Sequence, residues 1–261
     1  MWHLKPDDIA CHNSTLVLAL QRGYLKHITL PIHRFLISSG GLRPNVRPQY
    51  LQDMREIWIF DPDPMERHRK FRSFWGRITE LQFALWLETI SYEITGLEAL
   101  NGGPDIEACE PNGGQGAFEL KFIGTEDSDF EMILRSISGA PEAYSISPYT
   151  AMNYLLFRAY EAAQQLRPYQ GSKTAVAIID AQTWWRFDVQ LKYQWIDWRD
   201  PTFIGTDPDP QWATFIAGQL KKYPGLYHDI GIILGQLDSV WIVRQTQYEF
   251  ELVHSFGASS A

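Results

Sequence analysis

The chain has 261 residues, of which 45% are apolar and 14% aromatic, so it can bury a sizeable core and is not a disordered tail. Its net charge of −8 at pH 7 argues against indiscriminate binding of nucleic acid, because contacts to phosphate come from Lys and Arg. The two cysteines, Cys11 and Cys109, match no zinc or redox spacing, which favours free thiols in a reducing compartment.

The beginning of the chain resembles neither a signal peptide nor a membrane anchor. Residues 1–8 lack a charged region followed by an apolar one, and no apolar run approaches transmembrane length. We therefore expect a cytoplasmic protein without a membrane partner. Charge is uneven, since residues 1–80 carry a net +4 and the remainder −12. A path for nucleic acid is accordingly expected over the N-terminal third.

The first part of the chain gives weak signals. Residues 10–38 mix apolar and basic residues, and the pattern does not decide between strands and a helix. Residues 38–48 are typical of a loop, whose Arg43 and Arg47 are either phosphate contacts or ordinary solvated charges. Ile57–Phe60 is a short apolar run that suits a strand or a docking segment.

A long helix is predicted from Asp63 onward. Asp63 suits the N-cap, Pro64 suits the first helical position, and Glu66 stands three residues after the cap. Apolar residues then recur at spacings of three and four, and we expect this stripe to face the core: Phe71, Trp75, Ile78, Leu81 and Leu85. Basic residues in the first turns form either a phosphate-binding surface or solvated helix surface: Arg67, Arg69, Lys70 and Arg72.

Three short strands are predicted next. Tyr92–Leu97 is typical of a strand, and Gly102–Glu107 and Ala117–Phe122 are strand-like runs that flank a turn at Pro111–Gly116. Two such runs joined by a turn rich in Gly and Asn predict a β-hairpin.

Charged residues lie at matching places in this hairpin. Alternation along its second strand puts Glu119 and Lys121 on one face and Leu120 on the other, while Asp105 lies on the partner strand and could face the same side. Desolvated charges are costly unless they pair or hold a metal. A divalent metal is the simplest explanation for two carboxylates and an ammonium on one face.

A helix and a strand are predicted after the hairpin. Residues 126–134 suggest an acidic loop that caps a short helix, and a longer helix should run from Pro148 to Leu166. Thr174–Asp180 is almost wholly apolar, as expected of a strand covered on both faces.

The C-terminal part is rich in aromatic residues. Between Trp184 and Tyr227 few basic residues accompany them, so we expect these rings to fill a core or an interface rather than to stack on bases. Asp238–Val243 and Tyr248–Val253 read as two further strands.

Other catalytic patterns are missing from the sequence. The seven histidines never recur at the spacing of metal ligands, and no glycine-rich loop ends in Gly-Lys-Ser or Gly-Lys-Thr. No Gly-x-Ser-x-Gly elbow is present either. Zinc hydrolases, P-loop enzymes and serine hydrolases of the elbow type therefore lose support.

The combination of Pro104-Asp105 with Glu119-x-Lys121, fourteen residues after Asp105, resembles the PD-(D/E)xK nuclease superfamily. The helix before the hairpin and the helix and strand after it extend the resemblance over residues 77–181. The resemblance implies an α/β fold: a restriction-endonuclease-like mixed sheet flanked by helices, with an α-β-β-β-α-β core and N- and C-terminal elaborations.

The same resemblance implies a site and an activity. Asp105 and Glu119 would hold Mg²⁺, with Mn²⁺ as a substitute, and Lys121 would orient or deprotonate the attacking water. Glu80 would be the third carboxylate near the metal, and Glu88, which lies among apolar neighbours, is its rival. The implied activity is metal-dependent hydrolysis of phosphodiester bonds in nucleic acid, with DNA favoured over RNA.

We divide the chain into an N-terminal elaboration at 1–62, a nuclease-like core at 63–181 and an aromatic-rich extension at 182–261 that packs on the same domain. A second hypothesis is a catalytically inactive protein-binding or immunity-type protein that retains this fold. Its acidic, aromatic-rich C-terminal part would bind a basic protein partner, and Lys121 would merely pair with a surface acid.

Overall fold

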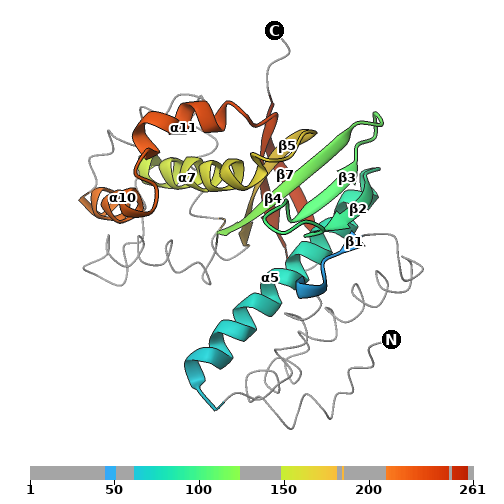
Figure 1. Cartoon of the computed structure of the whole chain (residues 1–261), viewed down its shortest axis with the longest axis horizontal. Coiled ribbons are helices and arrows are strands. Elements are labelled where there is room, and N and C mark those ends of the chain that lie inside the picture. Colours follow the sequence, from blue (N-terminus) through green and yellow to red (C-terminus); the bar gives the residue numbers. More distant parts are fainter. Residues whose placement is uncertain are drawn as a thin grey trace. The chain divides into compact units, whose positions relative to one another are not determined.

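The computed structural model describes residues 45–50, 62–123, 148–180, 184, 210–246 and 249–257 (Figure 1). These residues belong to two compact units, which divide between Gln115 and Gly116. Several predictions lie outside the described residues, namely those for residues 10–38, 57–60 and 126–134 and for Arg43, Trp185, Trp195 and Trp198. The side chains of Arg67, Phe71, Arg72, Trp75 and Ile78 lie outside the described part as well.

Helix α5 (Pro64–Thr89) of the first unit begins where the sequence predicts. The Asp63 side chain accepts a hydrogen bond of 2.9 Å from the backbone N–H of Met65, which satisfies one of the unpaired donors of the first turn. The Asp-Pro signal therefore fixes the start of this helix.

The buried face of α5 is wider than the predicted stripe. Leu81 is buried as expected, but Leu85 is only half-buried. Glu80, Ala84 and Leu87 are also buried, at the spacing of one helix face. Glu80 lies outside the stripe predicted from the sequence and is nevertheless buried, because α5 is covered over a wide arc.

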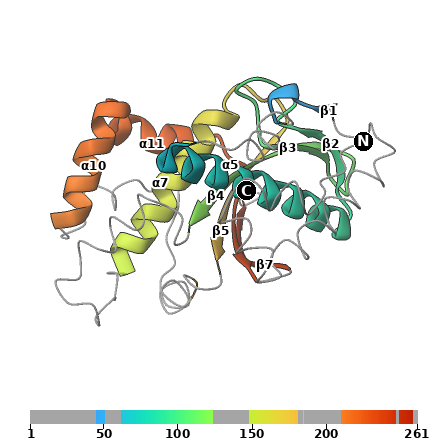
Figure 2. The same ribbon diagram turned by 90° about the horizontal axis from the view of Figure 1, so that it is seen from below.

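Three strands accompany α5. Strand β1 (Asn45–Val46) is parallel to β2 (Glu93–Leu97), and β2 is antiparallel to β3 (Ile106–Cys109), with a register shift between Ile94 and Gly96. Figure 2 shows α5 beside β2 and β3, and α5 contacts β2. The loop predicted at 38–48 is wrong for Asn45–Val46, because these residues pair with the edge of β2.

A tight turn follows β3 and leads into β4 (Gln115–Ile123). The N–H of Gly113 donates to the carbonyl of Glu110 at 2.8 Å, and the side chain of Asn112 accepts from the N–H of Gly114 at 2.8 Å. Gly113 has φ +86°, a conformation that side-chain-bearing residues rarely adopt. The Gly/Asn turn predicted from the sequence is therefore present.

The second unit contains a mixed sheet in the order β4-β5-β6-β7. Strand β5 (Ser172–Asp180) lies parallel to both β4 and β6 (Ser239–Gln245), and β7 (Phe250–Gly257) is antiparallel to β6. Every residue from Thr174 to Ile179 is buried, which confirms the prediction of a strand covered on both faces. The two C-terminal strands are confirmed as well.

Three helices lie together on one side of these strands in Figures 1 and 2. Helix α7 (Pro148–Leu166) has the predicted bounds and packs against β5, whereas α10 (Pro210–Lys222) and α11 (Leu226–Leu234) were not predicted. Aromatic rings fill the core here, among them Tyr154, Phe157, Tyr160, Trp184, Trp212 and Phe215. The core role expected for the C-terminal aromatics is thus confirmed for Trp184 and Trp212.

The described elements make an α/β protein with mixed sheet strands flanked by helices. Their order along the chain, α5-β2-β3-β4-α7-β5, is the predicted α-β-β-β-α-β order. No helix in the described ranges combines the length and apolar character needed to cross a lipid bilayer.

Candidate active site

Strand β4 places Glu119 and Lys121 on the same face, as predicted. The Nζ of Lys121 donates to Oε1 of Glu119 at 2.8 Å. Because side chains alternate along a strand, the preceding residue Phe118 lies on the opposite face. Its ring contacts that of Trp241, with the ring centroids 5.4 Å apart. The strand period alone therefore brings this acid and this base together.

Glu119 is only 1% exposed, which is unusual for a carboxylate. A buried charge is costly unless a partner of opposite sign and hydrogen bonds compensate it, and Lys121 supplies both. The expectation that Lys121 would pair with a surface acid if it had no catalytic role is therefore not met, because its partner is buried.

Gln165 of α7 is a second partner of Lys121, which donates to its side-chain carbonyl oxygen. The ammonium is thus held between β4 and α7. Sequence reasoning missed Gln165. The available signal was its place on α7 one turn after the buried Glu161 and Ala162.

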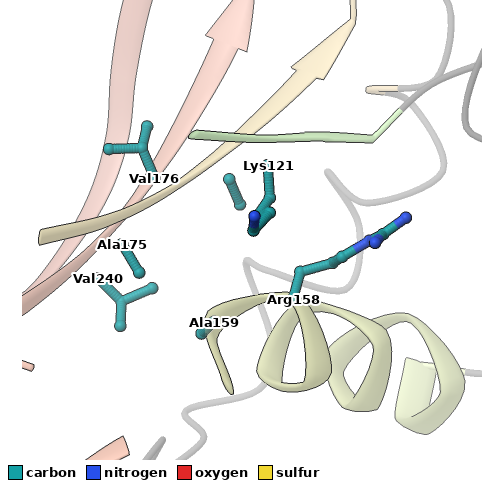
Figure 3. A pocket seen from close by; sticks show the side chains of 7 residues that line it. Lys121, Arg158, Ala159, Ala175, Val176 and Val240 are labelled. Carbon is teal, nitrogen blue, oxygen red and sulfur yellow. The ribbon is translucent and has the colours of Figure 1, made fainter. Parts of the chain in front are cut away.

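Lys121 also borders a narrow gap between the sheet and α7 that leaves no room for a water-sized molecule (Figure 3). Its lining is mostly apolar and small: Lys121, Arg158, Ala159, Ala175, Val176, Ala177 and Val240. The guanidinium of Arg158 is engaged along α7 by Tyr154 at 2.9 Å and Glu161 at 2.6 Å. Both cationic side chains of this lining are therefore held by neighbouring side chains.

Glu80, in the first unit, pairs with Arg77 one turn earlier on α5. Nη1 of Arg77 lies 3.0 and 3.2 Å from the two carboxylate oxygens of Glu80 and 2.5 Å from Oε1 of Glu98. The guanidinium also lies 4.7 Å above the ring centre of Tyr50, whose hydroxyl donates to the Arg77 carbonyl at 2.9 Å. Arg77 is therefore held by residues from three segments.

Glu80 is strongly affected by its surroundings. Burial and the nearby charge of Asp105 raise the pKa of Glu80 to about 8, although Arg77 opposes this rise. Burial alone would lower the pKa of Arg77. The carboxylates of Glu80 and Glu98 have the larger combined effect, so the pKa of Arg77 is raised. Burial and the charge of Asp105 therefore favour the protonated form of Glu80 at neutral pH.

Asp105 stands one residue before β3, whereas the sequence pattern predicted a place within the strand. Its carbonyl accepts a hydrogen bond of 2.8 Å from the N–H of Glu98. This bond ties the segment carrying Asp105 to the end of β2.

Glu88, the rival of Glu80, is exposed. Its apolar neighbours in the sequence suggested a buried acid, but the helix turns this residue outward, and that expectation is wrong. Of the two candidates, Glu80 is the one that lies near Asp105.

The structure thus describes two partial groups of the predicted residues. In the second unit Lys121 is hydrogen-bonded to Glu119, and in the first unit the charge of Asp105 raises the pKa of Glu80. Within the described ranges, no three His, Cys, Asp or Glu side chains are arranged to hold a metal ion.

No protein-family model, curated protein or solved structure matches this chain.

Proposed function

We propose that this chain is a metal-dependent nuclease that hydrolyses phosphodiester bonds, with DNA as the favoured substrate. The observation that carries the proposal is the pairing of the buried Glu119 with Lys121 on β4, within the chain order α-β-β-β-α-β. On an exposed strand such a pair of charges would cost little free energy. A buried carboxylate is costly to desolvate, so its presence on β4 suggests a function. The charges gathered at Glu80 and Asp105 add support.

The sequence resemblance implies that Asp105, Glu119 and Glu80 supply the carboxylate oxygens of a Mg²⁺ site, which Mn²⁺ would also fill. The bound ion would stabilise the negative charge that develops on the phosphate. Glu119 has a further task, because its carboxylate fixes the ammonium of Lys121 at 2.8 Å.

Lys121 is the proposed residue that positions the attacking water. An ammonium has three N–H donors, and the structure assigns one to Glu119 and one to Gln165. The third donor can then bind the water or a phosphate oxygen. Because two partners fix the ammonium, this donor has a defined direction, which is what positioning requires.

The test is a cleavage assay with plasmid, linear and single-stranded DNA and with RNA, in Mg²⁺ and in Mn²⁺. We expect Lys121→Met to lower the cleavage rate by about a hundredfold, because loss of the group that positions a reactant can cost about that much. Lys221→Met is the matched control, because Lys221 is exposed on α10. It should cleave like the wild type.

Loss of Lys121 also removes the partner of a buried carboxylate, so the fold must be checked. The double variant Glu119→Gln with Lys121→Met removes both charges and should fold better than Lys121→Met alone. A wild type that cleaves none of these substrates, or a folded Lys121→Met that cleaves normally, would contradict the proposal.

A second candidate is a binding protein that retains the fold without the chemistry. The observation that favours it is that Lys121 and Arg77 already compensate Glu119 and Glu80 in the structure. Such pairs hold carboxylates in place without a cation. Absence of both cleavage and divalent-cation binding in the same assays would decide for this candidate.

A further inference from the structure

Three cations of the second unit gather at α7. Lys121 of β4 and Arg158 of α7 line the same narrow gap, and Figure 3 shows the two side chains on facing elements. Lys222, the last residue of α10, lies 3.5 Å from one carboxylate oxygen of Glu161, and Nη1 of Arg158 lies 2.6 Å from the other. We call Lys121, Arg158 and Lys222 the cation row.

The carboxylates that pair with the cation row lie deeper than the cations. The side chain of Glu119 is 2% exposed, whereas that of its partner Lys121 is 17% exposed. The side chain of Glu161 is 10% exposed, whereas those of Arg158 and Lys222 are 16% and 63% exposed. The outer side of this group of charges is therefore positive.

The charges of this group do not cancel. Three cations face two carboxylates, Glu119 and Glu161, which leaves a local excess of one positive charge in a chain whose net charge is −8. The exposed ion pair of Lys222 and Glu161 contributes little to stability. The hydroxyl of Tyr223 also donates to Glu161, at 3.3 Å, so this carboxylate keeps two donors when Lys222 binds another anion.

Arg158 is held in a fixed direction. Its Nε donates to the hydroxyl of Tyr154 at 2.9 Å, and its guanidinium lies 5.1 Å from the centre of that ring. A guanidinium is planar and its N–H donors match the oxygens of a phosphate, whereas an ammonium acts as a point charge. The cation row therefore combines one directional phosphate ligand with two point charges.

We propose that the cation row binds the phosphate backbone of the nucleic-acid substrate, with Arg158 and Lys222 contacting phosphates next to the one at Lys121. The inference rests on the proposed function, because it takes nucleic acid as the substrate. It gives the second unit a substrate-binding surface of its own, in addition to the basic residues at the start of α5. An acidic protein needs such local positive surfaces to attract a polyanion.

The test is binding of a duplex DNA oligonucleotide to the full chain at several salt concentrations, in Ca²⁺ to suppress cleavage. Lys222→Gln should weaken binding to every sequence and lower the slope of log affinity against log salt by about 0.9, the value for one phosphate contact. Lys221→Gln is the matched control, because it makes the same charge change at the preceding exposed residue of α10, outside the cation row. It should leave the slope unchanged.

Arg158 needs a double variant, because Arg158→Gln alone would leave the buried Glu161 with less compensation. Arg158→Gln with Glu161→Gln removes one charge of each sign, so the net charge of the chain stays the same. The slope should still fall by about 0.9, because it counts the phosphates that are contacted. A melting curve must show that the double variant folds. If it does not fold, Lys222→Gln and Lys222→Glu decide, and the charge reversal should weaken binding further.

The outcomes separate this inference from the proposed function. Wild-type slopes in Lys222→Gln and in the folded double variant, or an equal fall in Lys221→Gln, would overturn the inference, and cleavage by the wild type would leave the proposed function standing. A wild type that binds DNA through the cation row but cleaves no substrate would keep the binding surface and overturn the proposed catalysis. A wild type that neither binds nor cleaves would overturn both.

Discussion

Glu80 shows what the burial of a carboxylate costs. It is buried on α5, and two effects oppose its charge, first the loss of solvent and then the charge of Asp105. The pair with Arg77 at 3.0 Å favours the charge but does not outweigh them. Without a cation, the folded chain therefore holds the proton of Glu80 more tightly than the unfolded chain does.

This difference predicts that stability falls with rising pH when divalent cations are absent. The pKa of Glu80 rises from its ordinary 4.5 to about 8 in the folded chain. Between these values the unfolded chain loses the proton and the folded chain keeps it, so the free energy of unfolding falls as pH rises. The loss begins near pH 4.5, is complete above pH 8 and is on the order of a few kcal/mol.

The measurement is urea denaturation at several pH values in a chelator, for the wild type and Glu80→Gln. Since the amide does not titrate, the fall between pH 5 and 8 should be smaller in the variant by about the contribution of Glu80. Equal pH profiles for the two proteins would show that Glu80 titrates alike in both states.

The sequence predicted the pair of side chains that the two-residue period of a strand brings together. It missed the pairs that only tertiary contacts bring together. Glu119 and Lys121 are two residues apart on a strand, so alternation alone put them together. Glu98 lies 21 residues from Arg77 and Gln165 lies 44 residues from Lys121, and no local pattern connects them. The burial of Glu80 likewise depends on what covers α5.

Two glycines of this protein should respond in opposite ways to replacement by alanine. Gly113 closes the turn between β3 and β4 with φ +86°, whereas Gly218 lies within helix α10, and an added Cβ would meet no atom within 4 Å at either. Packing is therefore equal at the two positions. The backbone conformation alone decides the effect of an alanine.

We expect Gly113→Ala to lower the free energy of unfolding by about 1 kcal/mol, because alanine strains a positive φ. Gly218→Ala should raise it by about 0.5 to 1 kcal/mol, because alanine is the better helix former. Urea denaturation of the two variants and the wild type checks both signs. A fall in stability at Gly218, or none at Gly113, would contradict the account.

The helices and strands were predictable where the local sequence favours a single structure. Asp63 and Pro64 fixed the start of α5, and the apolar run at Thr174–Asp180 identified β5. Helices α10 and α11 were missed, because their aromatic and apolar residues were interpreted as core without an assigned period. The short β1 was missed since two residues become a strand only through a partner.

At the scale of the whole molecule, a net charge of −8 opposes the approach of a polyanion. The N-terminal third carries the excess of basic residues, including the first turns of α5. Arg69 pairs there with Glu66 at 2.7 Å, but its side chain is 63% exposed, and such pairs contribute little and yield easily to a stronger ligand. This surface stays the predicted route for nucleic acid.

Neutralising Arg67, Arg69 and Lys70 together should weaken binding to duplex DNA of any sequence. The slope of log affinity against log salt should fall by about 0.9 for each phosphate that the variant no longer neutralises. Binding is measured in Ca²⁺ to suppress cleavage, with Lys221→Gln as the control. Divalent-cation affinity should survive in the triple variant, and identical salt slopes would show that these residues are ordinary solvated surface.

Strand β5 has a consequence for how the second unit folds. Both of its neighbours are parallel, so each pairing must close a long stretch of chain, and the hydrogen-bonded Thr174 and Ser239 are 65 residues apart. Such non-local contacts make folding slow, because the entropy of loop closure precedes the gain from pairing. A chain emerging from the ribosome would hold an apolar strand with one open edge until β6 is made, which is a period of risk for aggregation.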